Sequence, residues 1–435
     1  MAENSFNIWL GLLGLLPLVV YIILVFRDWE PLPATLVCVL IGAIITHQSL
    51  ISFGDVIAKS MGSFLALVGL IIMLGRGLGE VLTETKVAHT LVHGIIYGIG
   101  VNTKKKLMLG IMLADMVVVA LLGTMAGGVA IIAPIVLPIA AEVGLSSSTV
   151  AILFQAVAET ALILGPFTPP VVALLGFTKL SYLDMLLKVA IPVSLITLIP
   201  TWFMVQRIQR ETEEKAAYPR QEGVTKFIPT STSRRATVTF GLLFSIAIVY
   251  GIIVKASTSY VIVIMLGLAL ATGFMGGLKL DRILTVFVKG MAGNVGMFFL
   301  FVLLEPFINF IVQAGGFAAL AQLFRPLIEI GGRSVVVILG GVTGAFGISG
   351  AVVGELKTLH EMFLPLLSEY NVSMTAWAAA LIVATRVTNF IYPGGNMFSC
   401  LGFAGSRDVK SVIKNGVVIA ICQTVFLIFY AILFA

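Results

Sequence analysis

Two ionisable residues interrupt long apolar stretches, one in each half of this sequence. Glu159 lies in AVAETALILGPFTPPVVALLGF, residues 156–177, six residues before a Gly-Pro-Phe-Thr-Pro-Pro break. Arg386 lies in the second half, two residues before the start of the segment TNFIYPGGN, residues 388–396. A charged side chain at the centre of a membrane helix costs at least about 2.5–3.5 kcal/mol, so each of these residues is expected to have a function or a partner.

The two breaks suggest which chemistry these residues perform. An unwound segment exposes carbonyl oxygens that suit Na⁺, and the N-terminus of a half-helix attracts anions. A guanidinium group binds a carboxylate through two parallel hydrogen bonds, so Arg386 is predicted to bind an anionic substrate. Glu159 is predicted to bind a cation or a proton, or to pair with Arg386. The alternative is a buried ion pair that only joins the two halves.

Small polar residues and glycines around the breaks complete the predicted site. The residues expected to contact the substrate are Arg386, Thr168, Asn389, Asn396, Thr124 and Ser349. The residues expected to couple ions or protons are Glu159, Thr160, Thr388, Gly165, Gly394 and Asp115. No resident metal is predicted beyond a transported Na⁺. Four further charged residues in apolar stretches are assigned no role: Arg76, Glu80, Glu305 and Glu355.

The composition requires a membrane environment for these residues. Of the 435 residues 59% are hydrophobic and only 11% are charged, whereas soluble domains carry roughly a quarter charged residues. Apolar runs long enough to cross a bilayer as helices recur along the whole chain. We therefore predict an all-α polytopic protein of the cell membrane, with the lipid bilayer as its main partner.

Other function classes lack their sequence signals. The three cysteines and four histidines show no spacing typical of a disulfide framework or a metal site. No phosphate-binding glycine-rich loop with a lysine is present, so no ATP-driven pump is indicated. No nucleophile–base pair is recognisable either. We expect neither an enzyme nor a cofactor, and the basic residues do not indicate nucleic-acid binding.

The chain divides into two similar halves at its longest polar stretch, residues 206–235. LPIAAEVGLS at 137–146 matches LPLLSEYNVS at 364–373, and Gly-Phe recurs with nearly the same offset, at 176 and at 402. We therefore predict a duplicated architecture. The first repeat, 1–205, contains a hairpin at about 106–143 and a broken helix at about 148–170. The second repeat, 236–435, contains a hairpin at about 335–367 and a broken helix at about 374–396.

The distribution of basic residues predicts how these repeats lie in the membrane. If both hairpins re-enter on one side, each repeat contributes about five transmembrane helices and the two repeats are inverted. Lys104, Lys105, Lys106 and the basic linker 206–235 then lie on the same side, as the positive-inside rule requires of cytoplasmic segments. The linker is therefore predicted to be cytoplasmic.

Three stretches resemble the large membrane subunit of TRAP-type dicarboxylate transporters: IIAPIVLPIAAEVGL, LGPFTPPVVALLGF and LSYLDMLLKVAIP. The matching positions are Pro134, Pro138, Gly165, Pro166, Pro169 and Pro170. The layout is also similar to the wider ion-transporter superfamily, which includes gluconate, citrate and C4-dicarboxylate carriers. The resemblance implies an elevator-like secondary carrier, expected to be a homodimer, that moves an organic anion with Na⁺ or H⁺. The second break, YPGGN, departs from the pattern of the TRAP subunit.

Three transport functions therefore remain open at this point. A Na⁺- or H⁺-coupled symporter of a small carboxylate is preferred, because Arg386 suits such a substrate. A Na⁺/H⁺ antiporter of the same superfamily would use Glu159 and Asp115 as exchange sites. A membrane subunit that depends on a separate binding protein is the third.

Overall fold

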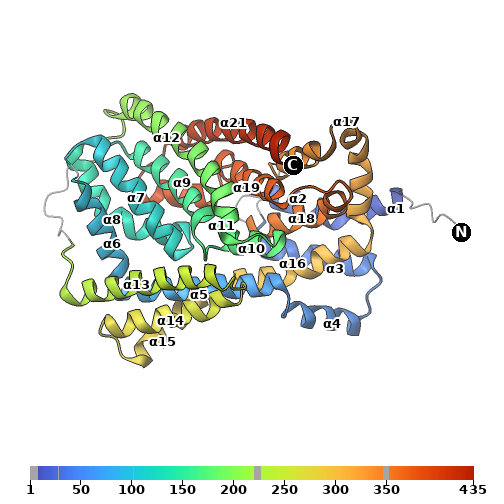
Figure 1. Ribbon diagram of the computed structural model, residues 1–435, viewed down its shortest axis with the longest axis horizontal. Coiled ribbons are helices and arrows are strands. Elements are labelled where there is room, and N and C mark those ends of the chain that lie inside the picture. The colour runs from blue at the N-terminus through green and yellow to red at the C-terminus, as the bar shows by residue number, and fades with distance from the viewer. Residues whose placement is uncertain (1–7, 28, 101, 220–226, 346–351) are drawn as a thin grey trace, which may run out of the picture.

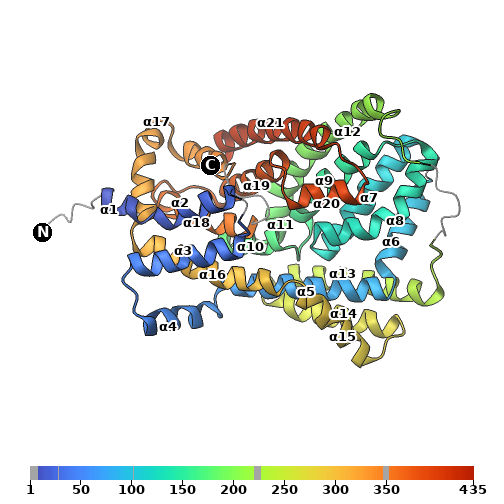
Figure 2. The ribbon, with the colours of Figure 1, turned by 180° about the vertical axis from the view of Figure 1, so that it is seen from behind.

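The computed structural model describes residues 8–27, 29–100, 102–219, 227–345 and 352–435, and these residues form helices joined by short turns. Nine helical segments in these ranges are long and apolar enough to cross a membrane. The prediction of an all-α polytopic membrane protein is therefore confirmed. Figures 1 and 2 show the molecule from two opposite sides, with the long helices α5 (Phe64–Glu84) and α13 (Ser231–Ile253) running along its long axis.

The remaining helices of the first half are α1 (Ile8–Leu13), α2 (Leu16–Phe26), α3 (Pro31–Ile45), α4 (Leu50–Ser60), α6 (Val87–Ile99), α7 (Lys104–Leu122), α8 (Met125–Val143), α9 (Ser147–Leu164), α10 (Pro169–Thr178), α11 (Tyr182–Met185), the π-helical turn η1 (Leu186–Ala190) and α12 (Ile191–Thr212). Those of the second half are α14 (Tyr260–Met275), α15 (Leu280–Ala292), α16 (Val295–Gln313), α17 (Gly316–Gly344), α18 (Val352–Glu369), α19 (Met374–Ile391), α20 (Gly395–Phe403) and α21 (Val409–Phe434).

The helices of the two halves follow one another in a corresponding order. A short helix, α4 or α15, precedes a long apolar helix, α5 or α16, in each half. The pair α6 and α7 corresponds to α17, which is kinked at Gly332, where φ is 61° and ψ is −149°. Glycine adopts this left-handed conformation without steric cost. The duplication and the inverted orientation of the halves in a membrane both stay predictions.

The helices α7 and α8 pack against each other, and together they comprise the residues predicted as the first hairpin. They meet at Gly123, whose φ of 66° closes the turn, and Thr124 directly precedes α8. In the second half, α18 covers the outgoing arm of the predicted hairpin. The tip of that hairpin, including Ser349, lies outside the described residues.

The non-helical linker is shorter than the sequence predicts. Helix α12 continues to Thr212, so the first seven residues of the predicted linker 206–235 are helical. An ion pair between Arg207 and Glu211, one turn apart, joins N and O atoms at 2.8 Å, and such pairs support a helix. Helix α13 begins at Ser231, where the preceding Thr230 side chain accepts a hydrogen bond from a backbone N–H of the first turn. The polar composition therefore marked the end of the apolar span rather than the end of the helix.

Ion pairs bring the start of this linker to the start of the first hairpin. Lys104 pairs with Glu213, and Lys414 pairs with Glu211 at 3.1 Å. The start of α7, the end of α12 and the start of α21 therefore lie at one end of the molecule. This arrangement is what a re-entrant first hairpin requires, although the side of the membrane stays a prediction.

The two helices that precede the breaks form the most deeply buried part of the fold. Every residue of α9 from Ser147 to Ile163 is buried, and so is every residue of α19 from Ala376 to Phe390. Helices that face lipid bury only one side, and α13 and α21 have long rows of exposed apolar residues. Both views place α9 and α19 in the interior, surrounded by other helices. Polar groups on α9 and α19 are therefore shielded from lipid by protein.

Candidate functional site

Both helix breaks lie where the sequence places them. Helix α9 ends at Leu164, and an extended Gly165 leads through a short loop to α10, which begins with two prolines. Helix α19 ends at Ile391, and an extended Tyr392 leads to α20 at Gly395. A proline fits the first turn of a helix but not its interior. The chain therefore stops one helix and starts another within four residues at each break.

The tip of the first hairpin packs directly on the first break. A Cβ atom added to Gly165 would lie 2.5 Å from the carbonyl oxygen of Ala120 in α7, so only glycine fits there. A Cβ atom on Gly123 would lie 3.6 Å from Cδ of Pro169. The predicted ion-coupling residue Gly165 is thus required for close packing, and Thr124 at the hairpin tip lies beside the same break.

Glu159 and Arg386 form a buried ion pair between α9 and α19. Arg386 Nη1 contacts Glu159 Oε2, and it also donates to the carbonyl oxygen of Glu159 at 3.2 Å. The side chains of Glu159 and Arg386 are 0% and 1% exposed. The two residues are 227 residues apart, which is also the offset between the matching segments of the two halves. Equivalent positions of two repeats meet in this way when they lie close to a two-fold axis that relates the repeats.

The second break also contributes to the environment of Glu159. Asn396 Nδ2 donates to Glu159 Oε1 at 3.3 Å. Asn396 is the second residue of α20, and α20 packs along α9, as Figure 2 shows. The free N–H groups at the start of a helix carry a partial positive charge, which favours a nearby carboxylate. Arg386 and Asn396 therefore both contact the carboxylate of Glu159, and Asn396 lies at the start of α20.

Several other predicted site residues satisfy the backbone around the breaks. The Thr168 hydroxyl contacts the carbonyl oxygens of Leu162 and Gly165 at 2.6 and 2.8 Å, and so it closes the end of α9. The Thr160 hydroxyl donates to a carbonyl oxygen one turn earlier in α9 at 2.7 Å. Gly394 is the extended residue that precedes α20. In this structure these residues shape the breaks, and the two hydroxyl groups are already used.

Two residues of α19 connect the second break to its surroundings. The Thr388 hydroxyl donates to the carbonyl oxygen of Gly344, the last residue of α17, at 2.9 Å. The backbone oxygen of Asn389 accepts a hydrogen bond from Gln155 Nε2 of α9 at 2.9 Å. Gln155, one turn before Glu159, thus gives a second polar contact between α9 and α19. The sequence analysis did not select it, because a glutamine in an apolar stretch gives no charge signal.

Asp115 lies in the interior near the same helices. It is fully buried in α7, and neither carboxyl oxygen makes a hydrogen bond with a described residue. The peptide group of Ala158, next to Glu159, lies beside it. The thiol of Cys400 in α20 is within electrostatic range of both Asp115 and Glu159. The structure therefore brings Asp115 into the neighbourhood of the ion pair, as the functional prediction requires.

Glu355 is a site residue that the sequence analysis left without a role. It lies in the first turn of α18, and its two carboxyl oxygens are buried without a hydrogen-bond partner in the described parts of the chain. Arg386 and Thr388 are its polar neighbours within electrostatic range. The sequence signal that could have identified Glu355 as a site residue is its position just after the glycine-rich segment predicted as the hairpin tip. The sequence could not show that α18 brings Glu355 within electrostatic range of Arg386.

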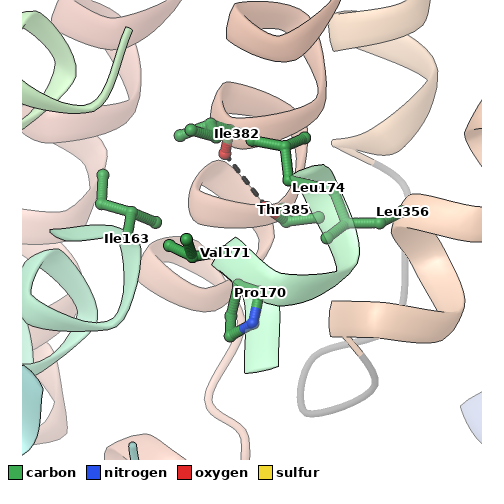
Figure 3. A pocket seen from close by; sticks show the side chains of 7 residues that line it. All are labelled: Ile163, Pro170, Val171, Leu174, Leu356, Ile382 and Thr385. Atoms are coloured by element: carbon green, nitrogen blue, oxygen red, sulfur yellow. Dashed lines mark hydrogen bonds between the residues drawn. The ribbon is translucent and has the colours of Figure 1, made fainter. Parts of the chain in front are cut away.

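A small apolar cavity separates the first break from the second half (Figure 3). Its lining residues are Ile163, Pro170, Val171, Leu174, Leu356, Ile382 and Thr385. The Thr385 hydroxyl is turned to the carbonyl oxygen of Ile382 at 3.0 Å. No charged side chain lines the cavity, so it does not suit an ion; it lies where α10 meets α18 and α19. Leu356 and Thr385 are the sequence neighbours of Glu355 and Arg386.

Comparison with known proteins gives a match to a family model and matches to solved structures. Residues 3–179, less than half of the chain, match the model of the Na⁺/H⁺ antiporter family. The structure is similar to the crystal structure of the YdaH transporter of Alcanivorax borkumensis, with a TM-score of 0.68 over 92% of this chain and 98% of that chain. The sequence identity of this pair is 14%, so the likeness concerns the fold. Curated protein sequences give no significant match.

Together with the all-helical fold, these matches support a membrane transporter of the secondary type and not an enzyme. The matching segment 3–179 includes Asp115, Glu159 and the first break. Neither the family model nor the YdaH structure is that of a TRAP-type carrier, so the resemblance to that family stays a prediction.

Proposed function

We propose that this protein is a secondary transporter that exchanges Na⁺ for H⁺ across the membrane. The proposal rests on one observation: the buried pair of Glu159 and Arg386 has two further buried carboxyl groups in its neighbourhood, that of Asp115 beside the peptide group of Ala158 and that of Glu355 within electrostatic range of Arg386. An unpaired carboxylate in a protein interior is costly and is expected to take a proton or a cation. A site that accepts either ion, one at a time, is what exchange requires.

Within this proposal Glu159 provides the central cation site. The C-terminal end of α9 and the break that follows it offer carbonyl oxygens, which suit Na⁺. Asn396 supplies a side-chain amide at the same carboxyl group. Na⁺ bound at Glu159 would take the place that Nη1 of Arg386 holds in this structure. The match of residues 3–179 to the Na⁺/H⁺ antiporter family supports the same function independently of this geometry.

The test is proton movement driven by Na⁺ in proteoliposomes that contain only the purified chain and an internal pH dye. Vesicles loaded with Na⁺ and diluted into Na⁺-free choline buffer should acidify inside as Na⁺ leaves. Vesicles loaded with choline should not. The E159Q variant should lose the signal. The E361Q variant should retain it, because Glu361 pairs with Lys357 at 2.7 Å on α18 and lies outside the cluster. If folded wild-type protein moves no protons in response to Na⁺, exchange is not its function.

Symport of a small carboxylate with Na⁺ or H⁺ is the second candidate. It is favoured by two nitrogens of Arg386, Nε and Nη2, which are buried without a hydrogen-bond partner in the described parts of the chain. They offer the planar fork that binds a carboxylate. Labelled carboxylates added to the same proteoliposomes distinguish the candidates. Accumulation that depends on Na⁺ and is lost in R386K, without Na⁺-driven proton movement, would favour symport. It would also show that no separate binding protein is needed.

A further inference from the structure

We propose that Glu355 is a second partner for Arg386, and that movement of the guanidinium group from Glu159 to Glu355 frees Glu159 to bind the transported cation. Glu355 would then be a positioning residue that acts through Arg386. This inference rests on the proposed exchange function and adds a mechanism for cation entry to it.

The first argument is the incomplete pairing of Arg386. Only Nη1 of its guanidinium group contacts Glu159, although a guanidinium group offers five N–H donors. Nε and Nη2 are buried and make no hydrogen bond with a described residue. A buried donor without a partner costs about 1–3 kcal/mol. Arg386 is therefore only partly satisfied by Glu159.

The second argument is the state of Glu355. Both of its carboxyl oxygens are buried and make no hydrogen bond with a described residue, and the nearest opposite charge within its electrostatic range is Arg386. The Thr388 hydroxyl lies close enough to this carboxyl group to interact with it, while its hydrogen bond of 2.9 Å goes to the carbonyl oxygen of Gly344. A carboxyl group that lacks hydrogen bonds thus lies close to a guanidinium group with unused donors.

The third argument is the conservation of charge during the transfer. When Arg386 pairs with Glu159, Glu355 must be neutralised by a proton or a cation. When Arg386 pairs with Glu355, Glu159 must be neutralised by a proton or a cation. The number of unpaired buried charges is unchanged, so the penalty for burying charge does not block the transfer. A small cavity lined by Leu356 and Thr385, the sequence neighbours of Glu355 and Arg386, lies next to this cluster.

The location of the three residues gives the transfer a structural consequence. Glu159 lies in α9 of the first half, whereas Glu355 lies in α18 of the second half, which packs against α10 beyond the first break. Arg386 in α19 contacts Glu159 and is within electrostatic range of Glu355. Binding of a cation at Glu159 would therefore strengthen the contact of α19 with α18 and weaken its contact with α9.

The test is a double-mutant cycle on Na⁺ binding to the full purified chain, measured with ²²Na⁺ in a scintillation proximity assay. The E355Q variant should bind Na⁺ about tenfold more weakly, within the usual range of coupling between sites, because Arg386 then stays on Glu159. The R386Q variant should bind Na⁺ more tightly than the wild type. In the R386Q background, E355Q should have no further effect, and E361Q should have no effect in either background.

Two results would overturn the proposal. Equal Na⁺ affinity of E355Q and the wild type would show that Glu355 does not influence the site. An equal loss with and without Arg386 would show that Glu355 acts directly on Na⁺ or on the fold. If E355Q alone does not fold, weaker Na⁺ binding by R386Q/E355Q than by R386Q would still overturn the proposal, because Glu355 would then act without Arg386. A wild type that neither binds Na⁺ nor exchanges it for protons would instead refute the proposed function itself.

Discussion

Replacement of Arg386 by glutamine removes the guanidinium group and leaves the Glu159 carboxylate buried without its ion-pair partner. Glu159 is 0% exposed, so water cannot solvate the charge, and Asn396 supplies only one long hydrogen bond. Loss of one partner from a buried ion pair typically costs about 3–5 kcal/mol of stability. We therefore expect R386Q to unfold at a clearly lower temperature than the wild type in Na⁺-free choline buffer at pH 8.

Na⁺ should restore much of this loss, because a bound cation takes the place of the guanidinium group. A ligand present at about 100 times its Kd adds about 2.7 kcal/mol to the free energy of unfolding. In the wild type the same Na⁺ must first displace Arg386, so its stabilising effect should be smaller. The Na⁺-induced rise in the unfolding temperature should therefore be larger for R386Q than for the wild type.

Thermal unfolding of the detergent-solubilised protein, followed by loss of the monodisperse chromatographic peak, measures both effects. The matched control is R325Q, because Arg325 pairs with Glu369 at 2.8 Å where both side chains are largely exposed, at 49% and 40%. Such a surface pair contributes only about 0–1 kcal/mol, so R325Q should resemble the wild type with and without Na⁺. An R386Q variant as stable as the wild type without Na⁺, or one that gains no more from Na⁺, would refute the reasoning.

Three further predictions address other parts of the structure. D115N should fold normally but lose most Na⁺-driven proton movement in proteoliposomes, because it replaces a buried, unbonded carboxyl with an isosteric amide; full activity would exclude Asp115 from coupling. G165A should lose about 1–3 kcal/mol in thermal unfolding, since its Cβ would lie 2.5 Å from a carbonyl oxygen, whereas G241A, with open space around it, should be neutral or slightly stabilising. Partial burial raises the pKa of Asp408, but hydrogen bonds within its own helix and from Ser148 outweigh it and hold the pKa below its usual value. The D408A variant should therefore lose about 0.5–2 kcal/mol of stability at neutral pH. The difference in stability between D408A and the wild type should disappear as the pH falls below the unfolded-state pKa of about 3.9 and through the lowered pKa of the folded state.

The sequence by itself determined the class of fold and the position of the breaks. Long apolar runs allow only helices that satisfy their own backbone, and Gly-Pro or Pro-Gly-Gly segments stop a helix wherever they occur. These are local properties, so the ends of α9 and α19 could be placed within a few residues. The polar segment after α12 was less informative, because charged residues such as Arg207 and Glu211 continue a helix as readily as they leave it.

Only the tertiary structure decided which polar groups meet. The matching segments of the two halves are offset by 226 or 227 residues, which relates Glu159 to residue 385 or 386, and the structure shows that Arg386 is its ion-pair partner. Neither Glu355 nor Cys400 could be assigned to the cluster from the sequence, because their approach depends on how α18 and α20 pack against helices far away in the chain. A charged residue in an apolar stretch can be recognised in the sequence, because burying its charge is costly. The partner of that residue depends on which side chains lie within a few ångströms of it once the helices have packed.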